Sequence, residues 1–172
     1  DFLTPDDHLL EIGCGTGSTA LKLAPSVKQM TATDISREML TIAKEKLADT
    51  DLENLRFVQT EATKPIDGAP FDAACAFSIL HLLDDLDEGL AHLHRLIRPG
   101  GMLITKTACL RDMNFAIPPM IKVMQWLGKA PDVLLFSAPE LEAAMRKAGF
   151  EIVESGYHGK TRSTRFIAAR RT

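Results

Sequence analysis

The sequence predicts an α/β fold in which one doubly wound, mostly parallel sheet lies between two layers of helices. Strand-like apolar runs alternate with helical patterns along the 172 residues, as parallel strands joined by helices require. Residues 71–78 are almost wholly apolar, which is typical of a central strand covered on both faces. A glycine-rich loop follows the first apolar run and precedes the first helical pattern. The length suits a single domain spanning residues 1–172.

The expected strands are short apolar runs that end at turn residues or at the start of a helical pattern. They are His8–Ile12, 27–33, Leu55–Gln59, 71–78, 102–107, 150–156 and 165–169. Such sheets bind ligands beyond the carboxyl ends of their strands, where the strand order reverses. The loops that follow the strands are therefore the places to look for functional residues.

The expected helices have recognisable starts and stops. The first covers about residues 17–24 and stops at Pro25, and Ser36 is placed to cap the second. The third carries an apolar stripe from Leu86 to Ile97 and ends before a Pro-Gly-Gly turn. Ser137 and Glu140 form the pattern of a capping box for the last helix, and a glycine follows its end.

Composition argues against several classes of protein. The formal net charge is −3, so the whole molecule does not present the positive field of a nucleic-acid-binding protein. The three cysteines Cys14, Cys75 and Cys109 form no C-x-x-C pair, which argues against a disulfide framework or a zinc site and fits a reducing cytoplasm. No apolar run approaches the ~20 residues needed to span a bilayer. We therefore expect a cytoplasmic protein without a metal ion, a bound nucleic acid or a membrane span, and the sequence carries no signal for its oligomeric state.

Basic residues gather near the C-terminus with no acidic residue among them. They are Lys160, Arg162, Arg165, Arg170 and Arg171. A basic segment of this kind can contact phosphate, or it can be a final strand whose charges are solvated. The second interpretation is favoured, because charge asymmetry alone is weak support for a binding site.

The first loop of the predicted sheet reads Glu11-Ile-Gly13-Cys-Gly15-Thr-Gly17. Its glycines permit positive φ and close approach of a ligand, and the helix beyond it offers free N–H groups. Asp34 stands at the end of the second strand, 21 residues after Gly13, where a carboxylate can accept hydrogen bonds from both hydroxyls of a ribose. Asp34 could instead help to cap the next helix. The ribose interpretation is favoured, because the glycine loop and the acid occur together.

At these residues the sequence resembles a known family. The motifs that carry the resemblance are Glu11-Ile-Gly-Cys-Gly-Thr-Gly17, Asp34-Ile35-Ser36, Phe71-Asp72 and Leu96-Ile-Arg-Pro-Gly-Gly101. They are similar to the ordered motifs of class I S-adenosylmethionine-dependent methyltransferases, in particular the group that includes ubiquinone and menaquinone C-methyltransferases. The resemblance implies a Rossmann-like three-layer α/β/α fold with a seven-stranded sheet in the order 3-2-1-4-5-7-6 and strand seven antiparallel. It also implies S-adenosylmethionine as the cofactor and methyl transfer to a small, apolar or amphipathic acceptor.

The resemblance assigns cofactor contacts residue by residue. Glu11, Gly13, Cys14, Gly15, Thr16 and Gly17 are expected to line the methionine part of the cofactor, Asp34 to hold the ribose, Ile35 to pack on the adenine, Glu61 and Ala62 to lie near the adenine amine, and the backbone of Phe77 and Ser78 to meet the ammonium group. Glu61 departs from the family, which usually has Asp there. Family members also carry helices before strand one, whereas seven residues precede His8 here. N-terminal cap helices are therefore expected to be absent from this sequence, so either it is part of a longer protein or its cofactor site is unusually open.

The acceptor side is expected in two places. Residues 113–136 interrupt the alternation between strand five and the last helix, and in this family an insertion here often forms part of the acceptor pocket. Its pocket candidates are Met113, Phe115, Met120 and Trp126. Alternatively, the insertion is a helix that simply adds to the core. His81, just after strand four, is the candidate for a catalytic base, and its alternative role is to cap the next helix or to bind a backbone carbonyl.

Two other functions fit the same fold. The first is a nicotinamide-dependent dehydrogenase, although Ser18 stands where the dehydrogenase pattern has its third glycine. The second is a non-catalytic protein that binds the cofactor or a protein partner. The branches that methylate amino groups of DNA or protein glutamine are disfavoured, because no Asn-Pro-Pro-Tyr sequence follows strand four.

Overall fold

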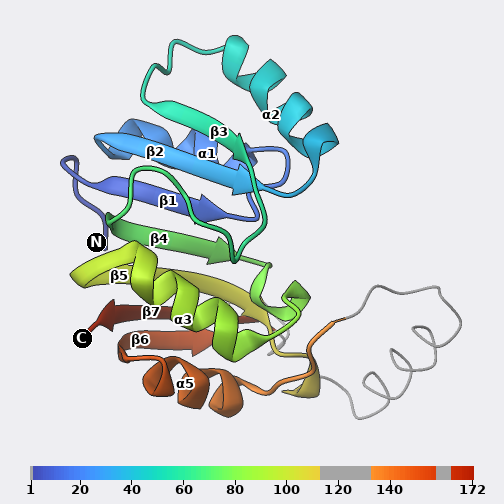
Figure 1. The fold of residues 1–172 in the computed structure, drawn as a ribbon, viewed down its shortest axis with the longest axis vertical. Coiled ribbons are helices and arrows are strands. Elements are labelled where there is room, and N and C mark those ends of the chain that lie inside the picture. The colour runs from blue at the N-terminus through green and yellow to red at the C-terminus, as the bar shows by residue number, and fades with distance from the viewer. Residues whose placement is uncertain (1, 113–132, 158–163) are drawn as a thin grey trace, which may run out of the picture.

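The computed structural model describes residues 2–112, 133–157 and 164–172, and its centre is a single sheet (Figure 1). The strands are β1 His8–Ile12, β2 Gln29–Asp34, β3 Leu55–Gln59, β4 Phe71–Phe77, β5 Ile97–Ala108, β6 Phe150–Tyr157 and β7 Thr164–Arg171. Their order is β3-β2-β1-β4-β5-β7-β6, and β7 runs antiparallel to both β5 and β6. The predicted strand order and the reversed last strand are confirmed.

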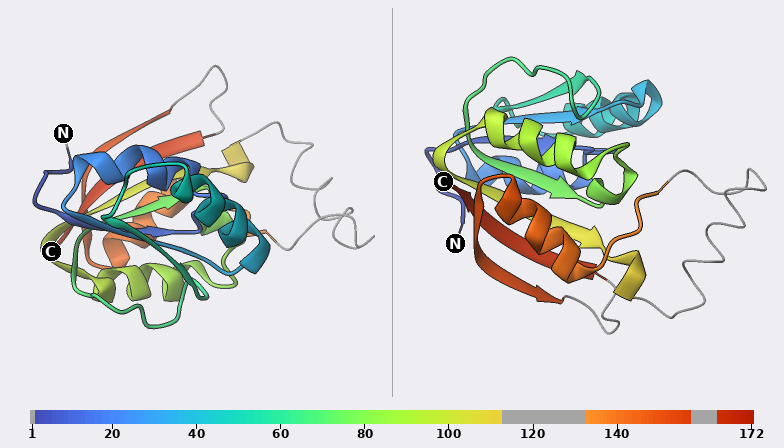
Figure 2. Two further views of the ribbon diagram at one scale, coloured as in Figure 1. Left: turned by 90° about the horizontal axis from the view of Figure 1, so that it is seen from above. Right: turned by 60° about the horizontal axis from the view of Figure 1, so that its bottom comes forward.

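Helices cover both faces of the sheet (Figure 2). α1 Ser18–Leu23 and α2 Arg37–Ala48 pack on one face, where Ala20, Leu40 and Ala43 join a buried apolar cluster with Leu9 and Met30. α3 Leu86–Leu96 and α5 Ala138–Lys147 pack on the opposite face and form a second cluster. The three-layer α/β/α arrangement therefore follows from alternate strand residues facing two separate cores.

The predicted helix starts are confirmed in detail. Ser36 Oγ accepts a hydrogen bond from Met39 N at the start of α2. Ser137 and Glu140 form a reciprocal capping box at the start of α5, which ends just before Gly149. Short 3₁₀ turns complete the connections, at Ala24–Ser26, Leu80–Leu82 and Leu110–Asp112.

The expected start of strand five was wrong. β5 begins at Ile97, five residues earlier than predicted, because Ile97 already pairs with Phe71 of β4. The Pro-Gly-Gly turn lies inside the strand, and the register shifts between Phe71 and Ala73. At Gly101 an added Cβ would lie 2.5 Å from the carbonyl oxygen of Asp72, so glycine lets the irregular turn press against β4. Strand two also starts later than predicted, at Gln29, because the 3₁₀ turn after α1 occupies the chain up to Ser26.

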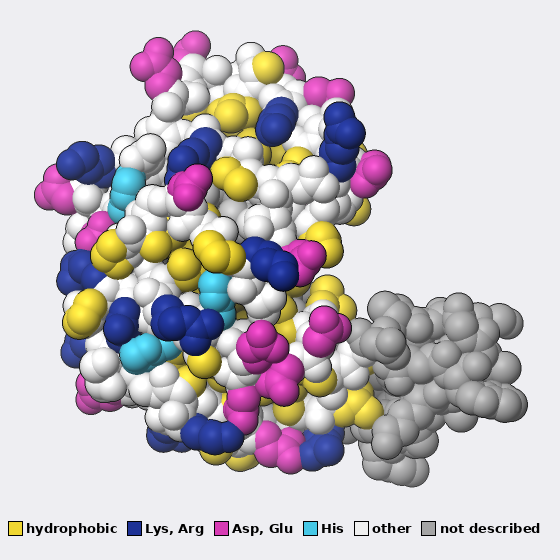
Figure 3. All heavy atoms as spheres, in the orientation of Figure 1, with side chains coloured by type: hydrophobic (Ala, Val, Ile, Leu, Met, Phe, Trp, Pro, Cys, Tyr) yellow, Lys and Arg dark blue, Asp and Glu magenta, His cyan; other side chains and the backbone are white. Residues whose placement is uncertain are grey.

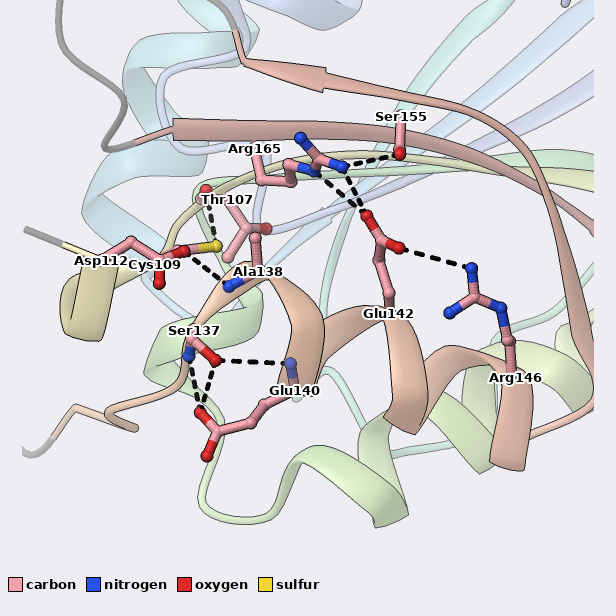
Figure 4. Close-up of polar contacts among 10 residues, drawn as sticks. All are labelled: Thr107, Cys109, Asp112, Ser137, Ala138, Glu140, Glu142, Arg146, Ser155 and Arg165. Atoms are coloured by element: carbon pink, nitrogen blue, oxygen red, sulfur yellow. Dashed lines mark hydrogen bonds and ion pairs between the residues drawn. The ribbon is translucent and has the colours of Figure 1, made fainter.

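An ion-pair network fastens α5 to the antiparallel edge of the sheet (Figure 4). The Arg165 guanidinium of β7 donates to Glu142 of α5 at 2.6 Å and to Ser155 of β6 at 2.8 Å. The Arg165 and Glu142 side chains are both mostly buried, and Arg146 donates to the second oxygen of Glu142. Arg171 donates to the backbone carbonyl at the start of β5. Arg165 and Arg171 therefore stabilise the sheet and its helix, which favours the strand interpretation for these two, whereas Lys160 and Arg162 lie outside the described residues.

Most of the predicted insertion lies outside the described residues, which end at 112 and resume at 133. Met113, Phe115, Met120 and Trp126 all fall in that interval, so their pocket role stays a prediction. The described helices include none that is both long and apolar enough to cross a membrane.

Candidate functional site

A cleft opens at the carboxyl ends of the central strands, with a cavity of about 290 Å³. Its walls come from the ends of β1 and β2, from the segment after β3, and from the segment between β4 and α3. Five of the predicted cofactor residues meet in it, namely Gly13, Asp34, Ile35, Glu61 and Ala62. This is the place where the strand order reverses, since β1 pairs with β2 on one side and with β4 on the other.

The glycine loop turns sharply between β1 and α1. Gly15 and Gly17 have φ of +53° and +72°, a region that favours glycine. A Cβ at Gly17 would lie 2.7 Å from the Phe57 ring and 2.9 Å from Ala43 Cβ, so the loop sits directly on α2 and β3. A Cβ at Gly15 would meet nothing within 4 Å, which leaves its backbone open to a ligand.

The Asp34 carboxylate connects the glycine loop to the start of α2 by hydrogen bonds. One carboxylate oxygen accepts from Gly15 N at 2.7 Å and the other from Ser36 N at 2.9 Å. The side chain also lines the cleft. Each carboxylate oxygen has a further lone pair, so the capping role and a ribose contact are compatible.

Glu11 lies in β1, two residues before the loop begins, and is not among the residues that line the cleft. The residue is 2% exposed, and its Oε2 has no hydrogen-bond partner among the described residues. Burial raises the pKa of Glu11 from the usual 4.5 to about 7. Burial, together with the Glu11 and Asp34 carboxylates, raises the pKa of the neighbouring Cys14 to about 12. Cys14 therefore stays a neutral thiol near pH 7 and does not act as a nucleophile.

The cleft is lined by carboxylates. They belong to Asp34, Glu61, Asp84, Asp85 and Glu88, and no lysine or arginine is among the described residues that line it. Acidic side chains also gather over the start of α3 in Figure 3. Lys64 lies 3.8 Å from Glu61, but both side chains are largely exposed, so water screens this pair. The lining gives the cleft a negative field that favours a cationic ligand.

His81 lies in the 3₁₀ turn Leu80–Leu82 after β4, next to the cleft residue Leu82. Its Nδ1 is buried without a hydrogen-bond partner in the described part of the chain, and its backbone oxygen accepts from Leu134 N at 2.8 Å. Burial lowers the pKa of His81 below 6.5, so the ring is neutral near pH 7 and able to accept a proton. The alternative capping role of His81 was wrong, because Asp85 caps α3 by accepting from Glu88 N.

Phe77 and Ser78 lie where β4 leaves the sheet. The Phe77 ring lines a second cavity, of about 570 Å³, on the face of the sheet that carries α1. Ser78 has a positive φ of 56°, and its N–H donates to the carbonyl of Lys106 at 2.8 Å. Contact between their backbone carbonyls and a cofactor stays a prediction.

The sequence interpretation missed several residues of the site. Ile79, Leu82 and Leu83 line the cleft opposite Asp34 and Ile35. Their only signal was their place directly after strand four, because apolar side chains there look like core residues. Ile35 and Leu82 are 67% and 45% exposed, so the cleft carries two uncovered apolar walls that suit a flat aromatic ring. The described residues contain no group of three or more His, Cys, Asp or Glu side chains arranged to hold a metal ion.

A family model described as "Methyltransferase domain" matches residues 10–103, which is more than half of the chain. The chain belongs to this methyltransferase domain family. The match covers the glycine loop, Asp34 and the strands that build the cleft, and it confirms the resemblance to class I S-adenosylmethionine-dependent methyltransferases.

Individual proteins are similar over most of the chain. An O-methyltransferase of Pyrenophora dematioidea is 27% identical over 155 residues, which cover 88% of this chain and 57% of that protein. A demethylmenaquinone methyltransferase of Lactococcus lactis is 28% identical over 177 residues, covering 88% of this chain and 68% of that protein. The structure of an S-adenosylmethionine-dependent methyltransferase from Mesorhizobium loti matches with a TM-score of 0.80 and 18% identity, over 99% of this chain and 94% of that one. That last likeness supports the fold, and this chain spans little more than half of the fungal relative.

Proposed function

We propose that this chain binds S-adenosylmethionine in the carboxylate-lined cleft and transfers its methyl group to a small, apolar or amphipathic acceptor. The observation that carries the proposal is the cleft itself, which combines the glycine loop, Asp34 and acidic walls without a lysine or arginine among its described lining residues. S-adenosylmethionine is a cationic nucleoside, whereas a nicotinamide dinucleotide carries a negatively charged pyrophosphate. The field of the cleft supports the first and opposes the second.

The residues in and around the cleft fit S-adenosylmethionine. Asp34 offers free lone pairs at the cleft wall for ribose hydroxyls, and Ile35 offers an exposed apolar side chain for the adenine. Glu61 and Ala62 would lie at the far end of the base. The open backbone at Gly15 leaves room for the methionine part, and Glu11, whose Oε2 has no partner among the described residues, precedes the same loop.

When bound, the cofactor supplies a methyl group already activated on a positively charged sulfur. The protein then has to hold the acceptor in line with that methyl and to exclude water, which are effects of proximity and orientation. His81 is the residue proposed to take a proton from a hydroxyl or amine acceptor, because its neutral ring is part-buried beside the cleft. Met113, Phe115, Met120 and Trp126 are proposed to shape the acceptor pocket.

The relatives support methyl transfer but differ in the acceptor. One is named an O-methyltransferase and the other a demethylmenaquinone methyltransferase. We therefore propose a class of acceptor, small and apolar or amphipathic, and leave the methylated atom to experiment.

Calorimetric titration tests the cofactor. We expect the chain to bind S-adenosylmethionine and S-adenosylhomocysteine and to show no heat of binding with NAD. Binding of NAD alone would reverse the assignment. A second assay follows transfer of a labelled methyl group to a panel of phenols, quinols, amines and fatty acids. Cofactor binding without transfer to any of them would favour a non-catalytic protein.

A further inference from the structure

Lys46 reaches from the last turn of α2 to the glycine loop. Its Nζ lies 3.0 Å from the Thr16 carbonyl oxygen, 3.0 Å from Thr16 Oγ1 and 3.1 Å from Ser18 Oγ. A lysine ammonium has three N–H donors, so the loop can accept all of them. A lysine in the last turn of a helix can bond that helix's own carbonyls, but this one binds a segment 28 to 30 residues away in sequence.

The two halves of the loop are held by different elements. The first half is fastened to β2, because Cys14 N donates to Thr33 O at 2.9 Å and Gly15 N donates to Asp34 at 2.7 Å. The second half, from Thr16 to Ser18, receives its side-chain hydrogen bonds from Lys46. Without Lys46, the turn into α1 would lose its polar connection to α2.

The spacing on α2 explains why the loop sits there. Ala43 and Lys46 are three residues apart and therefore share one face of the helix. Ala43 is small enough for Gly17 to pack against it, and Lys46 covers the neighbouring residues Thr16 and Ser18. One face of α2 thus makes both an apolar contact and hydrogen bonds with the same turn.

The ammonium also orients the Thr16 hydroxyl. Lysine can only donate, so Thr16 Oγ1 must accept from it, and the hydroxyl proton is left to point elsewhere. Ser18 Oγ lies 3.5 Å from Thr16 Oγ1, which is a long contact.

The geometry points to Lys46 as a positioning residue of the cofactor site, which holds the second half of the glycine loop against α2. This inference rests on the proposed function for the identity of the ligand. A loop that is already ordered loses less entropy on binding, so the effect of Lys46 falls on affinity for the cofactor.

The test compares Lys46→Met with Lys44→Met. Lys44 lies on the same helix, is exposed, and makes no hydrogen bond or ion pair with the described residues, so it controls for the loss of one positive charge. We expect Lys46→Met to weaken S-adenosylhomocysteine binding by roughly tenfold in calorimetry, the effect of about 1.4 kcal/mol. Lys44→Met should bind like the wild type. Lys46→Arg, which keeps the charge and several donors, should recover most of the affinity.

Amide hydrogen exchange of the ligand-free proteins gives an independent result. We expect faster exchange at Gly17 and Ser18 in Lys46→Met, while amides of β4 and β5 keep their wild-type rates. Equal affinity in the Lys46→Met and Lys44→Met proteins would overturn the inference, and so would unchanged exchange in the loop. Failure of the wild type to bind either form of the cofactor would instead overturn the proposed function, and the exchange comparison would still decide whether Lys46 clasps the loop.

Discussion

Replacing Glu11 by glutamine should stabilise the ligand-free protein at neutral and higher pH while weakening the cofactor site. Glu11 is 2% exposed and its Oε2 has no partner among the described residues, so its negative charge is buried without compensation. Glutamine has nearly the same shape and no charge. The variant therefore removes the electrostatic penalty and leaves the packing under the glycine loop almost unchanged.

The size and sign of the effect follow from the pKa of Glu11, which burial raises from 4.5 to about 7. Below about pH 4.5 the carboxyl is protonated in both the folded and the unfolded chain and contributes no penalty. Between pH 4.5 and about pH 7 the Glu11 carboxyl is more protonated in the folded than in the unfolded chain, so the free energy of unfolding falls as pH rises. Above about pH 7 the penalty is complete, at about 3 kcal/mol from roughly 1.4 kcal/mol per pKa unit.

Urea unfolding of the ligand-free wild type and Glu11→Gln proteins at about pH 5 and about pH 8 measures this penalty. The difference in the free energy of unfolding should grow by roughly 2–3 kcal/mol in favour of the variant between those values. Glu45→Gln, an exposed position on α2, controls for the loss of a negative charge. A difference that stays constant with pH would refute the reasoning, because it would mean that the Glu11 carboxylate is solvated or paired.

Three further predictions concern the same site. Gly17→Ala should lower the melting temperature more than Gly15→Ala, because both have positive φ but only the Cβ at 17 would meet the Phe57 ring, at 2.7 Å; equal shifts in a thermal scan would contradict this. Asp34→Ala should weaken S-adenosylhomocysteine binding by up to about 1.5–3 kcal/mol per lost charge-assisted bond, and unchanged affinity in calorimetry would remove Asp34 from the site. His81→Asn should lower turnover by roughly 10²-fold with cofactor affinity intact, and since burial lowers the pKa of His81, wild-type turnover should fall only as pH drops below 6.5. Near-normal turnover in a folded His81→Asn protein would assign the ring to structure.

The fold was predictable because local signals and global architecture agree. The strand Leu55–Gln59 and the capping box of Ser137 and Glu140 have the bounds that the sequence indicated. The strand order came from the family resemblance, since periodicity alone does not order strands. The start of β5 was missed because a Pro-Gly-Gly turn normally ends an element, whereas here Gly101 lets the turn stay in the sheet against the backbone of Asp72.

The glycine and polar residues of the cleft were more predictable than its apolar walls. Gly13, Asp34 and Glu61 follow strand ends and are polar or glycine, which marks them in any α/β sequence. Leu82 carries no such mark, since an apolar residue after a buried strand looks the same whether it packs inward or faces a cleft. The role of Lys46 could not be predicted from the sequence either, because its partners are a backbone carbonyl and two hydroxyls that only the fold brings close to it.

Several unusual features of the described residues occur together at the end of β1. Within seven residues the chain holds a buried unpaired carboxylate at Glu11 and positive φ at Gly13, Gly15 and Gly17. The buried carboxylate opposes folding, whereas glycine adopts positive φ without strain and so allows the chain to turn there. A carboxylate that gains nothing from the folded chain can gain from a cation placed above it, and a backbone without side chains can approach a ligand. Burying the charge of Glu11 costs free energy on folding, and a bound cation offsets part of that cost. Glu11→Gln should therefore raise the stability of the ligand-free protein and lower its affinity for the cofactor.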